Sequence, residues 1–290
     1  MFHKAQEVID YCEKNKIRLS DYILERELAR DQASREEVLK ELDRMLDVME
    51  ASSQATLEKG SAIAQDLVND FAKKTWTYAQ EAKNPITSPA LLRAMARALS
   101  TSETNAEMGQ IVAAPTAGAA GILPAALALA KERLDLERED LIHGILAGVG
   151  VAQFIGGYAC FSGAQGGCQA ECGSAAAMAA GALVQLFGGR VDQVFQGASL
   201  ALVNVLGLVC DPLGGLVQFP CSVRNASGVT NAMISADLAL AGVTSPIPFE
   251  EVCQAMGEVG QAMPTCLRET GEGGLAGTRT GQALTRKFFS

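Results

Sequence analysis

The sequence predicts a mainly α-helical protein, a compact helical domain with glycine-rich loops around a buried cluster site. Helix start signals and apolar residues at helical spacing recur along the chain. Period-two alternation is scarce, and β-branched residues do not gather into strand-like runs. Hydrophobic residues make up 48% of the 290 residues, which is ample material for a core.

The distribution of charge divides the chain into two predicted parts. The first 60 residues carry 24 charged side chains, whereas residues 141–235 carry five. We therefore predict a charged helical N-terminal region over residues 1–85 and a helical catalytic core over residues 86–290.

The first two helices with clear start signals lie near residues 34 and 88. Ser34 and Glu37 have the spacing of a capping box, and apolar residues follow them at helical spacing. Ser88 followed by Pro89 is typical of an N-cap and the first helical residue.

The later helices are predicted from proline, alanine and glycine signals. Leu123–Pro124 resembles the Ser88–Pro89 start, and an alanine-rich helix is predicted over residues 172–187, ending at Gly188–Gly189. Further helices are predicted at about 139–156, 194–208, 228–241 and 249–262.

Two classes of partner are disfavoured by composition. The net charge is -9 and no basic stripe is visible, so we expect no nucleic-acid partner. Residues 141–170 contain no Asp, Glu, Lys or Arg and are long enough to cross a membrane, but glycines interrupt them and no aromatic belt or cluster of Lys and Arg flanks them. We expect a buried helix there and no membrane partner.

The cysteines indicate a reducing compartment. The chain has eight of them, and its start, MFHKAQEVIDYCEK, lacks the apolar segment of a secretory signal. The sequence therefore predicts a cytoplasmic protein.

Three cysteines lie in glycine-rich segments of low polarity. They are Cys168 in GAQGGCQAECGSA, Cys210 in GLVCDPLGG and Cys221 in FPCSVRN. Soft metals and iron–sulfur clusters prefer thiolate sulfur. Three thiolates would leave one corner of a four-iron cluster without a protein ligand, and an open position is typical of a catalytic metal site.

Spacing alone leaves three interpretations open, because Cys172 is a fourth nearby cysteine. Three of the four could bind a cluster, or all four could bind zinc, although the paired C-x2-C pattern of zinc sites is absent. The four could also be inert buried thiols.

Matches to a known family cover nearly the whole chain. The main stretches are NAEMGQIVAAPTAGAAGILPA (105–125), GAQGGCQAECGSAAAMAA (163–180), LGLVCDPLGGLVQFPCSVRNA (206–226), NAMISADLALAGVTSPIP (231–248) and MPTCLRETGEGGLAGT (263–278). At these residues the chain resembles the iron–sulfur-dependent L-serine dehydratases (L-serine deaminases), specifically the α subunit of the two-chain bacterial form.

The resemblance implies a [4Fe-4S] cluster that is bound by Cys168, Cys210 and Cys221, with one iron open. Cys172 stands where relatives commonly have valine, so it is treated as a neighbour and as the first alternative to Cys168. Single-chain relatives end in a cysteine that can reach the cluster, whereas this chain ends in TRKFFS.

The implied activity is that of a lyase that converts L-serine to pyruvate and ammonia, a step in amino-acid degradation and gluconeogenesis. The open iron would act as a Lewis acid on the β-hydroxyl group. The other common route uses pyridoxal phosphate on a lysine, but the chain has no lysine between Lys131 and Lys287. Two alternatives remain, a zinc- or thiol-stabilised helical protein that binds a partner, and a cluster lyase for another β-substituted amino acid.

The general base is not identified by the sequence. His143 lies in an apolar helix, where a satisfied core histidine or a solvent-facing one is more common than a catalyst. In the family, a histidine motif lies in a separate β subunit or in the N-terminal domain of single-chain forms, and nothing here resembles it. We therefore expect a β subunit as partner, in a hetero-oligomer, or a homodimer.

The substrate-binding residues are predicted in two segments. In APTAGAAG, Thr116 offers a hydroxyl group, and Gly118 and Gly121 let the backbone approach a carboxylate near a helix start. Arg224 and Asn225 follow Cys221, and an arginine suits a planar carboxylate. For Arg224 an ion pair with Asp211 or Glu171 is the alternative, and for APTAGAAG it is a helix-start turn without a ligand.

Overall fold

The computed structural model describes residues 4–31, 34–63 and 67–289, and in these residues the protein is mainly α-helical, as predicted. Thirteen α-helices, three 3-10 helices and one π-helix are present in the described residues, which contain one isolated β-bridge, between Cys210 and Arg268. The α-helices are α1 Ala5–Asn15, α2 Leu19–Asp31, α3 Arg35–Gln54, α4 Phe71–Glu81, α5 Pro89–Ala106, α6 Ile122–Leu134, α7 Arg138–Tyr158, α8 Gly163–Gly166, α9 Ser174–Leu186, α10 Val191–Val203, α11 Cys221–Leu240, α12 Phe249–Ala262 and α13 Arg279–Phe288. The short helices are η1 Ala117–Ala119, η2 Gln169–Gly173 (the π-helix), η3 Leu213–Gly215 and η4 Thr265–Leu267.

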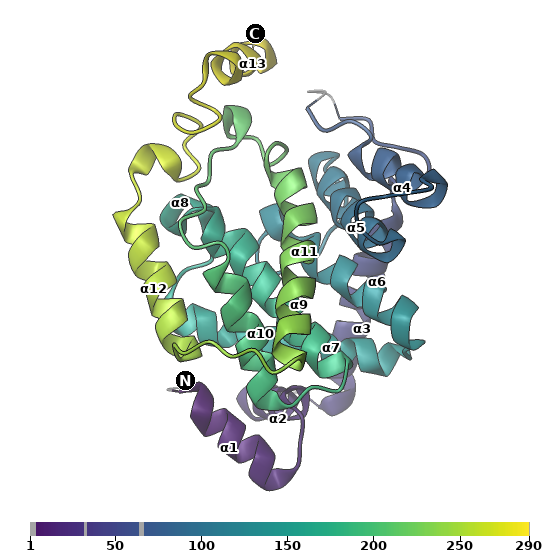
Figure 1. The fold of residues 1–290 in the computed structure, drawn as a ribbon, viewed down its shortest axis with the longest axis vertical. Helices are drawn as coiled ribbons and strands as arrows, with labels where there is room; N and C mark the ends of the chain where they lie inside the picture. Colours follow the sequence, from purple (N-terminus) through teal and green to yellow (C-terminus); the bar gives the residue numbers. More distant parts are fainter. Residues whose placement is uncertain (1–3, 32–33, 64–66, 290) are drawn as a thin grey trace.

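Helix α9 lies at the centre of the molecule, with α6, α7, α10 and α11 packed around it (Figure 1). Its alanines are buried, and the distance between packed helices depends on the side chains at their contact. At Gly181 an added Cβ would lie 2.8 Å from the Val151 side chain, so a larger residue has no room there. The alanine-rich composition therefore allows close packing on every side of α9.

Two predicted helix starts are confirmed in atomic detail. Ser34 and Glu37 form a reciprocal capping box at the start of α3. The Ser88 side chain accepts a hydrogen bond from the Leu91 backbone N–H, and Pro89 is the first residue of α5. These signals act over three residues, so the sequence alone determines them.

Other boundaries differ from the prediction. Helix α11 begins at Cys221, seven residues before the predicted start, because Pro220 occupies the N-cap position, where its missing N–H costs nothing. Helix α10 ends at Val203, and the chain then turns toward Gly207, whose φ of 86° is readily adopted by glycine. Helix α6 begins at Ile122, two residues before Pro124.

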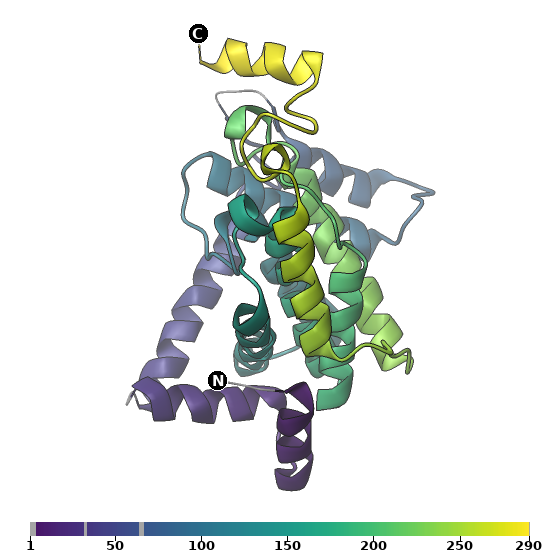
Figure 2. The same cartoon turned by 90° about the vertical axis from the view of Figure 1, so that its left-hand side faces the viewer.

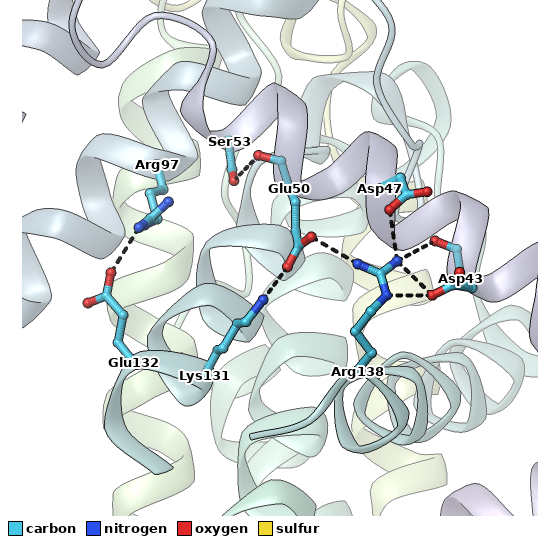
Figure 3. Close-up of polar contacts among 8 residues, drawn as sticks. All are labelled: Asp43, Asp47, Glu50, Ser53, Arg97, Lys131, Glu132 and Arg138. Carbon is cyan, nitrogen blue, oxygen red and sulfur yellow. Dashed lines mark hydrogen bonds and ion pairs between the residues drawn. The ribbon is translucent and has the colours of Figure 1, made fainter. Parts of the chain in front are cut away.

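Ion pairs connect α3 to the neighbouring helices of the core (Figure 3). The Arg138 guanidinium at the start of α7 contacts Asp43, Asp47 and Glu50 at 2.6, 2.8 and 3.1 Å. Lys131 of α6 also contacts Glu50, at 2.8 Å. The charged N-terminal helix α3 is therefore held on the surface of α6 and α7.

The two ends of the described chain lie at opposite ends of the molecule (Figures 1 and 2). Helices α1 and α2 lie at one end, and α13 lies at the other, against η3. Helix α7 is long and apolar enough to cross a membrane, but 67% of its most apolar window is buried inside the protein. That burial is typical of a core helix.

Candidate functional site

The structure places the three predicted cysteines at the ends of elements that converge near the start of α9. Cys168 directly precedes η2, Cys210 follows the turn after α10, and Cys221 is the first residue of α11. Their exposed fractions are 2%, 2% and 5%. A π-helix such as η2 is rare and is frequently found at functional sites.

The three sulfurs are close enough to influence one another. Burial and the charge of Cys168 raise the pKa of Cys221 to about 12. Burial and the charge of Cys168 also raise the pKa of Cys210. A thiolate at one of these cysteines disfavours the ionisation of the others. All three can therefore ionise together only if a cation offsets their charge, and a metal centre would supply one.

Cys172 contacts Cys168 directly, with 3.4 Å between the two sulfurs. This hydrogen bond, together with the nearby Arg224 guanidinium, lowers the pKa of Cys168. The same hydrogen bond and complete burial hold the pKa of Cys172 well above its ordinary value. Of the two, Cys168 is therefore the thiol whose ionised form is favoured.

Arg224 forms the ion pair that the sequence left open. Its Nη2 donates to Asp211 at 2.7 Å, and its Nη1 donates to the Val209 carbonyl at 2.9 Å. The second Asp211 oxygen accepts the Leu275 backbone N–H at 2.7 Å. Arg224 thus fixes the segment on both sides of Cys210, and the glycine-rich segment 270–278 packs on the same carboxylate.

Asn225 joins the predicted substrate loop to the start of α11. Its Nδ2 donates to the carbonyls of Gly118 and Cys221 at 2.7 and 2.9 Å, and its Oδ1 accepts the Gly121 backbone N–H at 2.9 Å. Both the nitrogen and the oxygen of this amide are therefore hydrogen-bonded to backbone groups. Asn225 therefore positions the loop relative to Cys221.

Thr116 lies at the start of the same loop, just before η1. Its Oγ1 is buried and makes no hydrogen bond of good geometry among the described residues, although a weaker hydrogen bond to Glu171 lowers the pKa of that carboxyl group. A buried polar group without a partner is unusual and suggests that a ligand satisfies it.

The site also contains two carboxylates that the sequence did not predict as functional. Ligand atoms of Glu171, Cys210 and Glu269 all lie within 4.8 Å of one another. Burial and the charge of Glu269 raise the pKa of Glu171. The available signal was that Glu171 is the only charged residue in 141–189.

Glu269 reaches this position through the backbone. The Cys210 N–H donates to Leu267 at 2.9 Å, and the Glu269 N–H donates to Cys210 at 2.7 Å. These bonds hold Glu269 at a φ of 62°, which non-glycine residues seldom adopt. Nothing local in the sequence predicts this pairing, because 57 residues separate Cys210 from Leu267.

His143 belongs to a different part of the molecule. It is buried in α7, and its Nδ1 lies 3.0 Å from the Ser20 hydroxyl group of α2. Burial lowers its pKa, and its carbonyl accepts a hydrogen bond from Gln185. Of the two interpretations of His143, the structure favours the core histidine.

The surroundings of the sulfurs fit a compact metal group. A Cβ added at Gly163 would lie 2.8 Å from both Cys210 Sγ and a Glu171 oxygen, so only glycine fits beside them. Buried thiols and a wall of small residues are compatible with a compact metal group, whose charge would offset the raised pKa values of Cys210 and Cys221 and let them bind as thiolates.

Comparison with known proteins identifies relatives over the full chain. Residues 14–276 match the family described as the serine dehydratase alpha chain. The L-serine dehydratase alpha chain of Peptoniphilus asaccharolyticus is 53% identical over 289 residues, which cover 100% of this chain and 99% of that one. The probable L-serine dehydratase alpha chain of Bacillus subtilis (strain 168) is 44% identical over 289 residues, covering 100% and 96%.

A longer relative has a different organisation. The L-serine dehydratase of Mycobacterium tuberculosis (strain CDC 1551 / Oshkosh) is 34% identical over 279 residues. The match covers 94% of this chain but 60% of that protein. The remaining part of the longer protein lies outside the match.

Proposed function

Because this chain belongs to the serine dehydratase alpha-chain family, we propose that it is the cluster-binding subunit of a lyase that converts L-serine to pyruvate and ammonia. The observation that carries the proposal is the convergence of Cys168, Cys210 and Cys221, from segments up to 53 residues apart, into one buried group. In the proposal these three residues bind a [4Fe-4S] cluster.

The cluster, when bound, supplies a Lewis acid for the β-hydroxyl group, which is otherwise a poor leaving group. The protein supplies the geometry. Arg224 and Asp211 hold the segment of Cys210, and Asn225 holds the loop 114–121 relative to Cys221. Such fixed supports are what a catalytic metal site needs in order to keep its ligands in place.

The charges of the site favour one orientation of serine. An added Cβ at Gly118 would lie 3.3 Å from a Glu171 oxygen, so this side of the loop faces a carboxyl group. Glu269 lies beside it. We assign the ammonium group of serine to the space next to these two acids, because a cation relieves their repulsion. The Thr116 hydroxyl group is proposed to form a hydrogen bond with the substrate.

A separate β subunit is part of the proposal. The Peptoniphilus and Bacillus relatives are named as alpha chains, and the Mycobacterium relative is longer than the region matched here. The described residues place His143 away from the sulfurs, against Ser20. The general base is therefore expected to come from the partner chain.

The cytoplasm is the proposed location. All eight cysteines are free thiols, which suits a reducing compartment. Cysteine thiolates without a cluster would also be oxidised in an oxidising compartment.

The decisive experiment measures iron and sulfide after anaerobic purification together with a β subunit. Wild type and Cys172→Ala are expected to be brown and to bind about four irons, whereas Cys168→Ala, Cys210→Ala and Cys221→Ala lose most of their iron. Serine deamination should require both chains. A colourless wild type with one zinc and no iron would instead favour the zinc-stabilised alternative.

A further inference from the structure

The contact between Cys168 and Cys172 is not used by the proposed function. Cys172 is 4% exposed, and its sulfur lies 3.4 Å from that of Cys168. Residues four apart on a helix lie on the same face, so the backbone of η2 brings the two thiols together. A second thiol beside the thiol of Cys168 offers a reaction that an aliphatic side chain at position 172 could not perform.

We propose that Cys172 is a resolving thiol, which forms a reversible disulfide with Cys168 whenever the site has no cluster and hydrogen peroxide or a related peroxide reaches it. The assignment of Cys168 as a cluster ligand rests on the proposed function. The pairing of the two thiols rests only on their geometry.

The disulfide requires local movement of the backbone, because helical residues four apart have Cβ atoms about 5–6 Å apart and a disulfide needs about 3.5–4.5 Å. A disulfide has a sulfur–sulfur distance of about 2.05 Å and Cα atoms about 4.4–6.8 Å apart, and helical residues four apart have Cα atoms about 6 Å apart. Cys168 is the residue before η2 and follows Gly166 and Gly167, the latter with a φ of 75°. Two preceding glycines give the chain the freedom to bring the sulfurs into bonding distance.

The chemistry balances in two steps. Peroxide oxidises the Cys168 thiol to a sulfenic acid, and one water leaves. The Cys172 sulfur then attacks the Cys168 sulfur, so that the S–S bond forms, the S–O bond breaks and a second water carries away the Cys172 proton. In total two thiols are oxidised and one peroxide is reduced to two waters.

The expected benefit is protection of a ligand. A sulfenic acid that no thiol contacts proceeds to sulfinic and sulfonic acids, which thiol reagents do not reverse, and in the described residues the sulfur in contact with Cys168 is that of Cys172. A disulfide is reduced by dithiothreitol, and Cys168 is then again able to bind iron. Cys172 therefore keeps cluster loss reversible.

The test uses the cluster-free full chain. Wild type, Cys172→Val and the control Cys12→Ala, which removes a buried thiol of α1, are treated with an excess of hydrogen peroxide, because a sulfinic acid consumes two peroxides per thiol and a sulfonic acid three. Free thiols are blocked with iodoacetamide, disulfides are reduced, and the released thiols are labelled with N-ethylmaleimide. Peptide mass spectrometry assigns the label at each cysteine, and matching melting curves of the reduced proteins establish that the variants are folded.

In wild type and Cys12→Ala we expect N-ethylmaleimide on both Cys168 and Cys172. In Cys172→Val we expect sulfinic or sulfonic acid at Cys168, and after dithiothreitol at least twofold less iron taken up on anaerobic reconstitution than by wild type. The proposal is overturned if iodoacetamide labels Cys168 and Cys172 in wild type, because both thiols were then still free. A disulfide from Cys168 to Cys210 or Cys221 would also overturn it. Because the mapping needs no cluster, it decides the pairing even if the chain fails to bind iron, which would count against the proposed function alone.

Discussion

The Arg224 guanidinium donates to the Asp211 carboxylate at 2.7 Å, and the two side chains are only 14% and 4% exposed. Asp211 follows Cys210 and Arg224 lies one turn after Cys221, so one ion pair joins the segments of two predicted ligands. Breaking a buried pair by removing one partner leaves an uncompensated charge.

Arg224→Ala is therefore expected to lower the free energy of unfolding of the metal-free chain by about 3–5 kcal/mol. Urea denaturation under reducing conditions measures the change. Arg190→Ala is the matched control, because it breaks an exposed Arg–Asp pair that solvent screens and that is expected to contribute little. Equal effects of the two substitutions would contradict the structural role assigned to Arg224.

Glu171→Gln tests the orientation proposed for serine. Loss of a charge-assisted hydrogen bond to the substrate ammonium group is expected to raise KM for serine roughly tenfold or more. Iron content should stay at the wild-type level, since Glu171 is not among the three ligands. Glu258→Gln, on the exposed side of α12, is the control and should leave KM unchanged. An unaltered KM in Glu171→Gln would place the ammonium group elsewhere.

Gly274→Ala tests the packing of the segment 270–278 on Asp211. Gly274 has a φ of 56°, and an added Cβ would collide with the Asp211 carboxylate. Gly207→Ala is the control, because Gly207 has a φ of 86° but no atom within 4 Å of an added Cβ. Both variants carry backbone strain of roughly 1–2 kcal/mol, but we expect only Gly274→Ala to show a further loss of thermal stability and of bound iron. Similar losses in both variants would mean that strain alone matters.

Glu103 predicts a pH dependence of stability. This fully buried carboxyl group of α5 accepts hydrogen bonds from Thr56 Oγ1 at 2.6 Å and from the Ala72 N–H at 3.2 Å, and burial raises its pKa above the ordinary 4.5. Above pH 4.5 the unfolded chain releases this proton while the folded chain keeps it. Stability therefore falls as the pH rises from 4.5 through the folded pKa.

Glu103→Gln removes this dependence, since a glutamine amide can accept from Ala72 and donate to Thr56 without ionising. Relative to wild type, the urea midpoint of the variant is expected to rise as the pH is raised from 4.5 to 7. Glu41→Gln, at an exposed carboxylate paired with Arg44, should show no such rise. Parallel curves for Glu103→Gln and wild type would contradict the assignment.

Local signals in the sequence were sufficient for much of the helical structure. The Ser34 capping box and the Ser88–Pro89 start were predicted because capping depends on contacts within three or four residues. The start of α11 at Cys221 was missed, since the helix was predicted to begin at about residue 228, but a proline at the N-cap is compatible with a helix beginning next to it.

The residues of the site also differ in how far the sequence predicted them. The types and spacing of the four neighbouring cysteines left a cluster, a zinc site and inert thiols open, and only the family resemblance favoured a cluster at Cys168, Cys210 and Cys221. Glu171 was visible only as an isolated charge, and Glu269 gave no signal, because its position depends on backbone pairing with Cys210 across the fold.

The sequence by itself determined the helical class, the capped helix starts and the thiol-rich chemistry, since these follow from side-chain type and from interactions between near neighbours in the chain. Only the tertiary structure decided that Arg224 pairs with Asp211, that Asn225 holds the loop at Gly118 and that Glu171 lies beside Glu269. These contacts depend on which helix faces pack together, and that is decided by the summed burial of the whole core, which no single motif encodes.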